Sequence, residues 1–333
     1  MKGRISMNGN IVHGMCLLAI CGLLFGGGKL SAGTIPETNI IKLKAKDTLT
    51  AIEMNRGDIL EFELVSGKIV RMELISTHAR VLSTTLKQLK AYENNGRART
   101  IYSFDCGLKI NGKEYTLERE VGTQRSFYEP WEIDGTRIWF DAVQDIFDLI
   151  LDEDHGECRP RKHARFAIQD ATLRICPEKL NPWLPLPEGG LKIEQCYRGE
   201  DCWLGAFSGI SAHNGLDINH PKGTPLWAPL DIDDHFYFNS LAMGQNNNRW
   251  RGIHRWPNGS KWILQAHHMT ELTVKEHDPI KKGQQFAWGA GVLSGGVDHS
   301  HFIFKIRDHG ETILLDPWIL FWQMYKDQKA GQP

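Results

Sequence analysis

Short segments of alternating polar and apolar residues, separated by tight-turn dipeptides, dominate the first half of this 333-residue chain. Residues 58–65 alternate in this way, which places their apolar side chains on one face of a β-strand. The pairs Asn111-Gly112 and Asp134-Gly135 lie between such segments and are strong signals of β-hairpin turns. One helix is predicted at residues 142–151, where apolar residues share a face. We therefore expect residues 33–178 to form a β-rich domain.

A stretch rich in proline and glycine, residues 176–190, follows this domain and is typical of a linker or a domain entry. Residues 179–333 would then form a second domain. The chain is 41% hydrophobic, so it has enough apolar side chains to bury a core. Its formal net charge is −1, which gives no reason to expect nucleic acid as a partner, because polyanions usually bind basic surfaces.

The start of the chain has the layout of a secretory signal peptide. Lys2 and Arg4 precede an apolar run at residues 15–25, and small residues around Ala32 offer a cleavage site. We therefore expect residues 1–32 to be removed and the mature chain to be exported to the periplasm, the cell envelope or the medium. The apolar run is short for a bilayer, so no membrane span is expected in the mature chain, with an uncleaved signal anchor as the alternative.

Five cysteines remain after such cleavage: Cys106, Cys158, Cys176, Cys196 and Cys202. In an oxidising compartment they are candidates for disulfides, and no CxxC pair indicates a zinc ribbon. Cys196 with Cys202 would close a short loop and Cys158 with Cys176 a longer one, which leaves Cys106 over. Other pairings stay open, because sequence does not fix the connectivity.

Two short histidine patterns lie in the second domain, His213-x-x-x-Asp217 and His299-x-His301. Each pattern alone is weak, because a chain with 14 histidines contains such spacings by chance. The apolar residues after His301 predict a β-strand, on which His299 and His301 would point to the same face. Two histidines and a carboxylate are a familiar zinc set, and three protein ligands leave the fourth position for water, as catalysis requires.

Residues 213–228, which read HNGLDINHPKGTPLWA, resemble the opening of the lysostaphin-type (LytM-type) zinc endopeptidases, an HxGxDI motif followed by a Pro-x-Gly-Thr-Pro turn. The family's next motif is a strand that ends in Y-x-H-L, and residues 265–269 match it with His268 in the histidine position. Its last motif, HLHF followed by a strand, is matched by residues 299–306. The resemblance spans about residues 200–322, with the motifs in the family's order.

The resemblance implies a fold and a site. The implied fold is mostly β, with a C-terminal antiparallel sheet that forms a groove of the lysostaphin type, similar to a duplicated hybrid motif, behind a β-rich accessory domain. The implied ligands of one zinc ion on the floor of the groove are His213, Asp217 and His301. The residues that would act on the reaction are His268 and His299.

The chain departs from the family at three places. The tyrosine of Y-x-H-L is replaced by Ala266, or by Gln265 if His267 is the aligned histidine, so His267 is a rival to His268 for the catalytic position. Ser300 replaces the usual leucine between the last two histidines. Residues 231–262 lack the family's A-x-x-D-G-x-V hairpin and are rich in tryptophan, asparagine and histidine. Because loops around such a groove set the substrate preference, we expect it to depend on this segment.

The function that the resemblance implies is that of a secreted zinc metalloendopeptidase. Such a hydrolase would cleave peptide bonds in the stem or the cross-bridge of bacterial peptidoglycan by means of a zinc-activated water. One alternative is a non-catalytic protein of the same fold that binds the wall or regulates another wall enzyme. Another is a peptidase that acts on a non-wall protein. The β-rich domain at residues 33–178 would direct the enzyme to its substrate, orient the groove or cover it.

Overall fold

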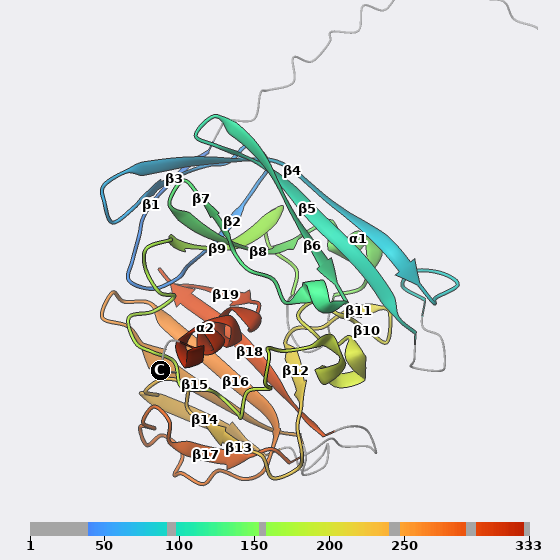
Figure 1. Cartoon of the computed structure of the whole chain (residues 1–333), viewed down its shortest axis with the longest axis vertical. Coiled ribbons are helices and arrows are strands. Elements are labelled where there is room, and N and C mark those ends of the chain that lie inside the picture. The colour runs from blue at the N-terminus through green and yellow to red at the C-terminus, as the bar shows by residue number, and fades with distance from the viewer. Residues whose placement is uncertain (1–38, 92–97, 153–157, 240–246, 291–297, 330–333) are drawn as a thin grey trace, which may run out of the picture. The chain divides into compact units, whose positions relative to one another are not determined.

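The computed structural model describes residues 39–91, 98–152, 158–239, 247–290 and 298–329. The predicted signal peptide, residues 1–32, lies outside the described residues. In the described ranges no helix is long and apolar enough to cross a membrane. These residues fold mostly into β-strands that pair in several largely antiparallel sheets, which confirms the predicted fold class (Figure 1).

Five strands of the first half form one sheet in the order β1-β3-β4-β5-β6. Their bounds are Ile40–Lys44 (β1), Ile59–Glu63 (β3), Ile69–Thr84 (β4), Thr100–Ile110 (β5) and Lys113–Val121 (β6). Asn111 and Gly112 join β5 to β6 with φ angles of 47° and 86°. A type I′ turn requires this left-handed conformation at both positions. The hairpin predicted at the Asn-Gly pair is therefore confirmed.

Four further strands form a second sheet in the order β2-β9-β8-β7. Their bounds are Thr50–Met54 (β2), Ala164–Asp170 (β9), Thr136–Val143 (β8) and Trp131–Ile133 (β7). The predicted Asp-Gly turn joins β7 to β8. The helix predicted at residues 142–151 is wrong in extent, because β8 continues to Val143 and the helix α1 covers Ile146–Leu149. All side chains of β8 are buried, so its sequence lacks the alternation that distinguishes a strand from a helix.

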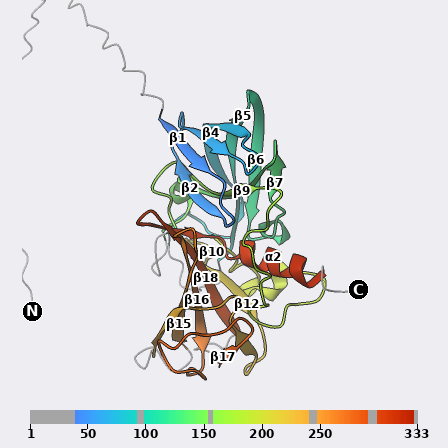
Figure 2. The same ribbon diagram turned by 90° about the vertical axis from the view of Figure 1, so that its left-hand side faces the viewer.

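The second half contains a six-stranded sheet, in which β12, β18, β16, β15 and β14 lie side by side and β19 also pairs with β18 (Figure 1). Figure 2 shows β12, β18, β16 and β15 in a view turned by 90°. The strand bounds are Leu216–Asn219 (β12), His299–Asp308 (β18), Lys261–Met269 (β16), Asn248–Arg255 (β15), Asp234–Phe238 (β14) and Glu311–Leu315 (β19). Two ribbons accompany it, formed by β10 (Ala206–Phe207) with β11 (Ser211–Ala212) and by β13 (Pro225–Trp227) with β17 (Gln285–Trp288). The remaining elements are η1 (Gln124–Ser126), η2 (Ile193–Gln195), η3 (Tyr197–Gly199) and the helix α2 (Trp318–Lys329).

One face of the six-stranded sheet packs into the core. The register aligns a buried row across four strands: Leu216, Phe302, Ala266 and Trp250. Phe321 of α2 covers this row and packs on Phe302, with ring centroids 5.3 Å apart. Since neighbouring residues along a strand point to opposite faces, the adjacent row with Asp217 and His301 faces away from this core.

A buried cluster of charges joins the two halves of the chain. Arg119 on β6 donates to the Asp316 carboxylate at 2.9 Å, and Arg165 on β9 donates to the Asp141 carboxylate at 2.5 Å. The backbone N–H of Asp316 donates to Asp141 at 2.8 Å, which links the two pairs. Removing one partner would leave the other charge buried and alone, which typically costs about 3–5 kcal/mol.

The structure does not support the expected disulfides. Neither Cys196 with Cys202 nor Cys158 with Cys176 is bonded, and no disulfide is present in the described part of the chain. All five cysteines are buried, and the Cys202 thiol donates to the Ser126 hydroxyl at 3.3 Å. Burial raises the pKa of Cys202 to about 11 and that of Cys176 to about 12. Such thiols stay protonated at neutral pH, so packing is their main contribution.

Candidate metal centre and catalytic site

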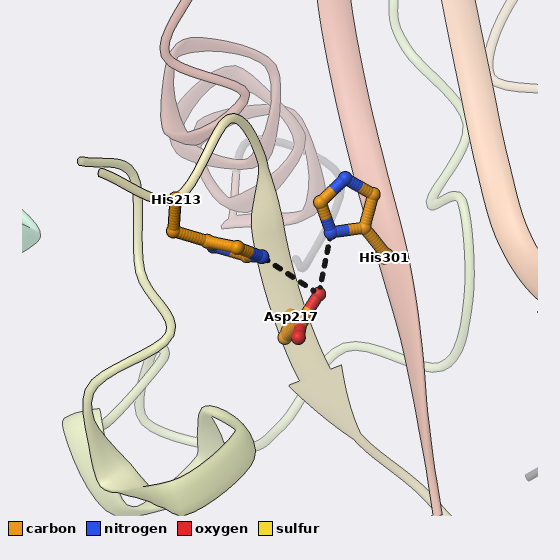
Figure 3. Close-up of side chains that lie close together, drawn as sticks. All are labelled: His213, Asp217 and His301. Carbon is orange, nitrogen blue, oxygen red and sulfur yellow. Dashed lines mark hydrogen bonds and ion pairs between the residues drawn. The ribbon is translucent and has the colours of Figure 1, made fainter. Parts of the chain in front are cut away.

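Asp217 and His301 lie directly opposite each other on the paired strands β12 and β18. His301 Nδ1 lies 2.8 Å from Asp217 Oδ1, and His213 Nε2 lies 3.5 Å from the same oxygen. Figure 3 shows the two imidazoles converging on this carboxylate from the loop before β12 and from β18. The three candidate ligand atoms lie within 4.8 Å of one another, and all three residues are buried. The structure thus brings together the residues that the resemblance implies as zinc ligands.

The donor set fits a zinc ion. Imidazole nitrogen and carboxylate oxygen are common zinc ligands, and ligands about 2 Å from a tetrahedral zinc ion lie roughly 3.3 Å apart. The separations of 2.8 and 3.5 Å bracket this value. His213 Nδ1 lies 3.2 Å from the Cys202 carbonyl oxygen, a contact that assigns the proton of the neutral ring to Nδ1 and leaves Nε2 as the metal-binding atom. Three protein ligands leave one tetrahedral position for water or substrate.

Gly215 allows the backbone to pass close to the His301 ring. A Cβ atom at this position would lie 2.4 Å from His301 Cε1 and 2.6 Å from the carbonyl oxygen of Phe302. Both distances are far shorter than a van der Waals contact, so only a residue without a side chain fits here. The glycine of the HxGxDI motif therefore has a steric role in this site.

A loop at residues 196–213 positions the first candidate ligand. The backbone N–H of His213 donates to the Gly205 carbonyl at 2.8 Å, and the His213 carbonyl accepts from Leu204 at 2.9 Å. Leu204 has a φ of 59°, a left-handed conformation that costs energy for a residue with a side chain. The Tyr102 hydroxyl on β5 donates to the Leu204 carbonyl, so the first half of the chain helps to hold this loop.

His267 and His268 both reach the site because β16 contains a bulge. Arg249 pairs with His267 and Asn248 pairs with Met269, which makes His268 the extra residue on this strand. His268 has a φ of 59°, the left-handed conformation found in one class of β-bulge. A bulge breaks the alternation of side chains, so two consecutive residues approach the same cluster.

The two histidines contact different members of the cluster. The His267 ring stacks on the ring of His301, with centroids 4.8 Å apart. The His268 ring meets the ring of His299 edge-on, with centroids 4.7 Å apart. His267 is 6% exposed and His268 is half-buried. His268 thus lies beside the other residue that the resemblance places in the reaction.

Tyr197 contacts the site, although no motif in the sequence points to it. It lies in η3, and its ring stacks on the His299 ring with centroids 4.2 Å apart and planes at 24°. His299 Nε2 also lies 3.4 Å from Asp217 Oδ2, so the second carboxylate oxygen of Asp217 faces a candidate catalytic residue. The only sequence signal for Tyr197 is an aromatic residue shortly before His213, which is too common to identify a site.

Other histidines of the second half have structural surroundings. His220 Nε2 lies 2.7 Å from the Ser300 hydroxyl, and His220 Nδ1 lies 3.0 Å from the Pro221 carbonyl oxygen. His235 Nε2 lies 3.1 Å from the carbonyl oxygen of Lys275. Burial lowers the pKa of both His220 and His235, which favours their neutral forms. Ser300, which departs from the family's leucine, thus serves as a partner for a buried histidine.

No protein-family model and no curated protein matches the sequence. Among solved structures, the chain is similar to the antimicrobial peptidase lysostaphin from Staphylococcus simulans, with 22% identity over 46% of this chain and 53% of that chain and a TM-score of 0.30. It is also similar to a zinc containing peptidase from Vibrio cholerae, with 11% identity over 79% of this chain and 83% of that chain and a TM-score of 0.24. The chain spans about half the length of two lysostaphin structures that it matches, 45% in one and 53% in the other, and 86% of a structure of the lysostaphin catalytic domain.

Proposed function

We propose that this protein is a zinc metalloendopeptidase that hydrolyses peptide bonds of bacterial peptidoglycan. The observation that carries the proposal is the position of Asp217. One of its carboxylate oxygens lies between His213 and His301, and the other faces His299. The candidate metal ligands and the candidate proton-transfer groups therefore form one continuous cluster, as a metal-dependent peptidase requires.

His213, Asp217 and His301 would hold the zinc ion. When bound, zinc supplies a Lewis acid and lowers the pKa of water towards neutrality. His268 and His299 would accept a proton from the attacking water and return it to the leaving amine, since histidine titrates near neutral pH. We assign this role to His268 over His267 because His268 contacts His299, whereas His267 packs on the ligand His301.

The proposal includes export of the chain, because the predicted signal peptide at residues 1–32 would bring the protein to a substrate outside the cytoplasm. Residues 33–178 would act as an accessory domain to the peptidase domain at residues 179–333. Two contacts support a close association of these parts: the hydrogen bond from Tyr102 to the Leu204 carbonyl and the ion pair of Arg119 with Asp316.

The test combines metal analysis with an assay on purified peptidoglycan. We expect the purified chain to bind one zinc ion and to release peptide fragments that mass spectrometry can assign to one cleaved bond. Chelation should abolish the release and added zinc should restore it. His301→Ala should abolish both zinc binding and cleavage, because it removes one of three metal ligands.

His78→Ala is the matched control, since His78 is an exposed histidine on β4 whose side chain contacts Asp105 at 3.2 Å. It should bind zinc and cleave at the level of the parent. Robust cleavage by His301→Ala would refute the proposal. A chain that binds peptidoglycan but holds no zinc would favour a non-catalytic wall-binding protein instead.

A further inference from the structure

A row of side chains crosses the six-stranded sheet at the level of the metal centre. The register places one residue of each strand in this row: Asp217, His301, His267, Arg249 and Phe238. Residues directly opposite each other in an antiparallel sheet point to the same face. Arg249 and Phe238 therefore lie on the face that carries the candidate metal ligands, which we call the site face.

Two further cations lie on the site face. Residues two apart on a strand share a face, so Arg251 follows Arg249 on β15, and Lys305 lies on the same side of β18 as His301. Burial and the nearby charge of Arg251 lower the pKa of Lys305. Two strand spacings separate Arg249 from His301, roughly 10 Å between backbones. We call Arg249, Arg251 and Lys305 the cationic strip.

The cations of the strip have no carboxylate partner within the described ranges. Arg249 Nε is buried and makes no hydrogen bond to any described residue. The buried Arg119 and Arg165, in contrast, are each paired with an aspartate. Asp234, at the far edge of the site face, is engaged by His277 at 3.1 Å. Arg251 is exposed and Arg249 and Lys305 are half-buried, so these unpaired cations are available to bind an anion on the site face.

Exposed aromatic side chains border the strip. Phe236 and Phe238 on β14 are 41% and 59% exposed, and they pair with Arg251 and Arg249 respectively. Clustered exposed apolar groups beside charged ones are typical of a binding surface. Both strands lie in residues 231–262, the segment in which the sequence departs from the lysostaphin type and in which we predicted the substrate preference.

Positive charge also continues beside the metal centre. Lys305 lines a cavity of about 320 Å³ together with Asn214, the residue that follows His213. The other charged residues that line this cavity are Glu53, Arg159, Arg161 and Arg165. Arg161 and Arg165 share Glu53, at 3.3 and 3.8 Å, and they also pair with Glu311 and Asp141 respectively, whereas Arg159 has no ion pair with a described residue. Arg159 and Lys305 are therefore the two cations of this cavity that have no ion pair with a described residue.

We infer that the substrate is an anionic peptide whose carboxylates bind the cationic strip while the scissile bond lies at the metal centre. Arginine suits this role because its guanidinium binds a carboxylate through two parallel hydrogen bonds. Phe236 and Phe238 would pack against apolar parts of the same peptide. The inference rests on the proposed function and narrows it, because an acidic stem peptide meets this requirement and a neutral glycine-rich cross-bridge does not.

The test uses two synthetic peptides of one sequence, one with free carboxylates at its glutamates and its C-terminus and one with every carboxylate converted to the carboxamide. Cleavage of each is followed with the zinc-loaded full chain, with Arg251→Gln and with Arg80→Gln. Arg80 is the matched control, an exposed arginine on β4 in a different sheet. Binding of both peptides to His299→Ala is measured by calorimetry, which reports binding without turnover.

We expect the parent to prefer the acidic peptide by at least tenfold in kcat/KM, and Arg251→Gln to lose about tenfold on this peptide alone, the typical effect of a charge-assisted hydrogen bond. Arg80→Gln should behave like the parent. Lys305→Met provides a second variant if Arg251→Gln alters zinc content or thermal stability.

The outcomes separate the two proposals. Equal cleavage of both peptides by the parent, or an equal loss on both in Arg251→Gln, would overturn the inference and leave the proposed function intact. Binding that depends on the carboxylates, in a parent chain that cleaves neither peptide, would overturn the proposed function and leave only the binding of carboxylates by the cationic strip.

Discussion

The close approach of Gly215 to His301 makes Gly215→Ala a sharp perturbation of the candidate metal centre. The added methyl group would lie 2.4 Å from His301 Cε1 and 2.6 Å from the Phe302 carbonyl oxygen. Ordinary contact begins at 3.4 Å, so the His301 ring and the backbone around residue 215 would have to move apart by about 1 Å. A displacement of about 1 Å costs on the order of 100-fold in rate. We expect kcat/KM to fall by about that factor and zinc affinity to fall roughly 10–100-fold.

Zinc affinity would be measured by competition with a chromophoric chelator, and activity by peptide cleavage at saturating zinc. Gly252→Ala on β15 is the control for overpacking, because its methyl group would lie 2.3 Å from Trp250 Cη2 in the core. That variant should lose about 1–3 kcal/mol of stability and keep its zinc affinity. Parent-like zinc affinity and activity in Gly215→Ala would refute the steric argument.

Further predictions concern residues around the site. Tyr197→Ala should lower kcat about three- to tenfold, because the His299 ring loses the aromatic ring on which it stacks. Tyr197→Phe should retain the stacking and the parent kcat. Equal losses of kcat in both variants would assign the effect to the Tyr197 hydroxyl instead. Arg119→Met should lower the free energy of unfolding in urea by about 3–5 kcal/mol, because Asp316 loses its buried partner; a loss below about 1 kcal/mol would contradict this. Burial raises the pKa of Glu200 to about 7 despite nearby arginines. Folded Glu200 therefore keeps a proton that the unfolded chain releases near pH 4–5, so its contribution to stability declines as pH rises to 7. In parallel urea titrations, the free energy of unfolding of Glu200→Gln minus that of the parent should increase from pH 5 to 8. A difference that stays constant with pH would contradict the raised pKa of Glu200.

Local rules explain which parts of the fold were predictable. The turn at Asn111-Gly112 follows from the left-handed conformation that asparagine and glycine tolerate. The shared face of His299 and His301 follows from the two-residue period of a strand. Prediction failed where burial removed the local signal, as in β8, which is buried on both faces. It also failed for the disulfides, because cysteine pairing depends on Cα distances and side-chain directions that only the fold sets.

The sequence by itself determined the order and spacing of the motifs that meet at the candidate metal centre, and with them the candidate ligands His213, Asp217 and His301. Only the tertiary structure decided that a bulge brings both His267 and His268 to the site. It also decided that Tyr197 stacks on His299 and that the cationic strip shares a face with the ligands. These features depend on the register between strands far apart in the chain. That register is set when one face of the sheet packs into the core, because a slip by one residue would exchange the two faces.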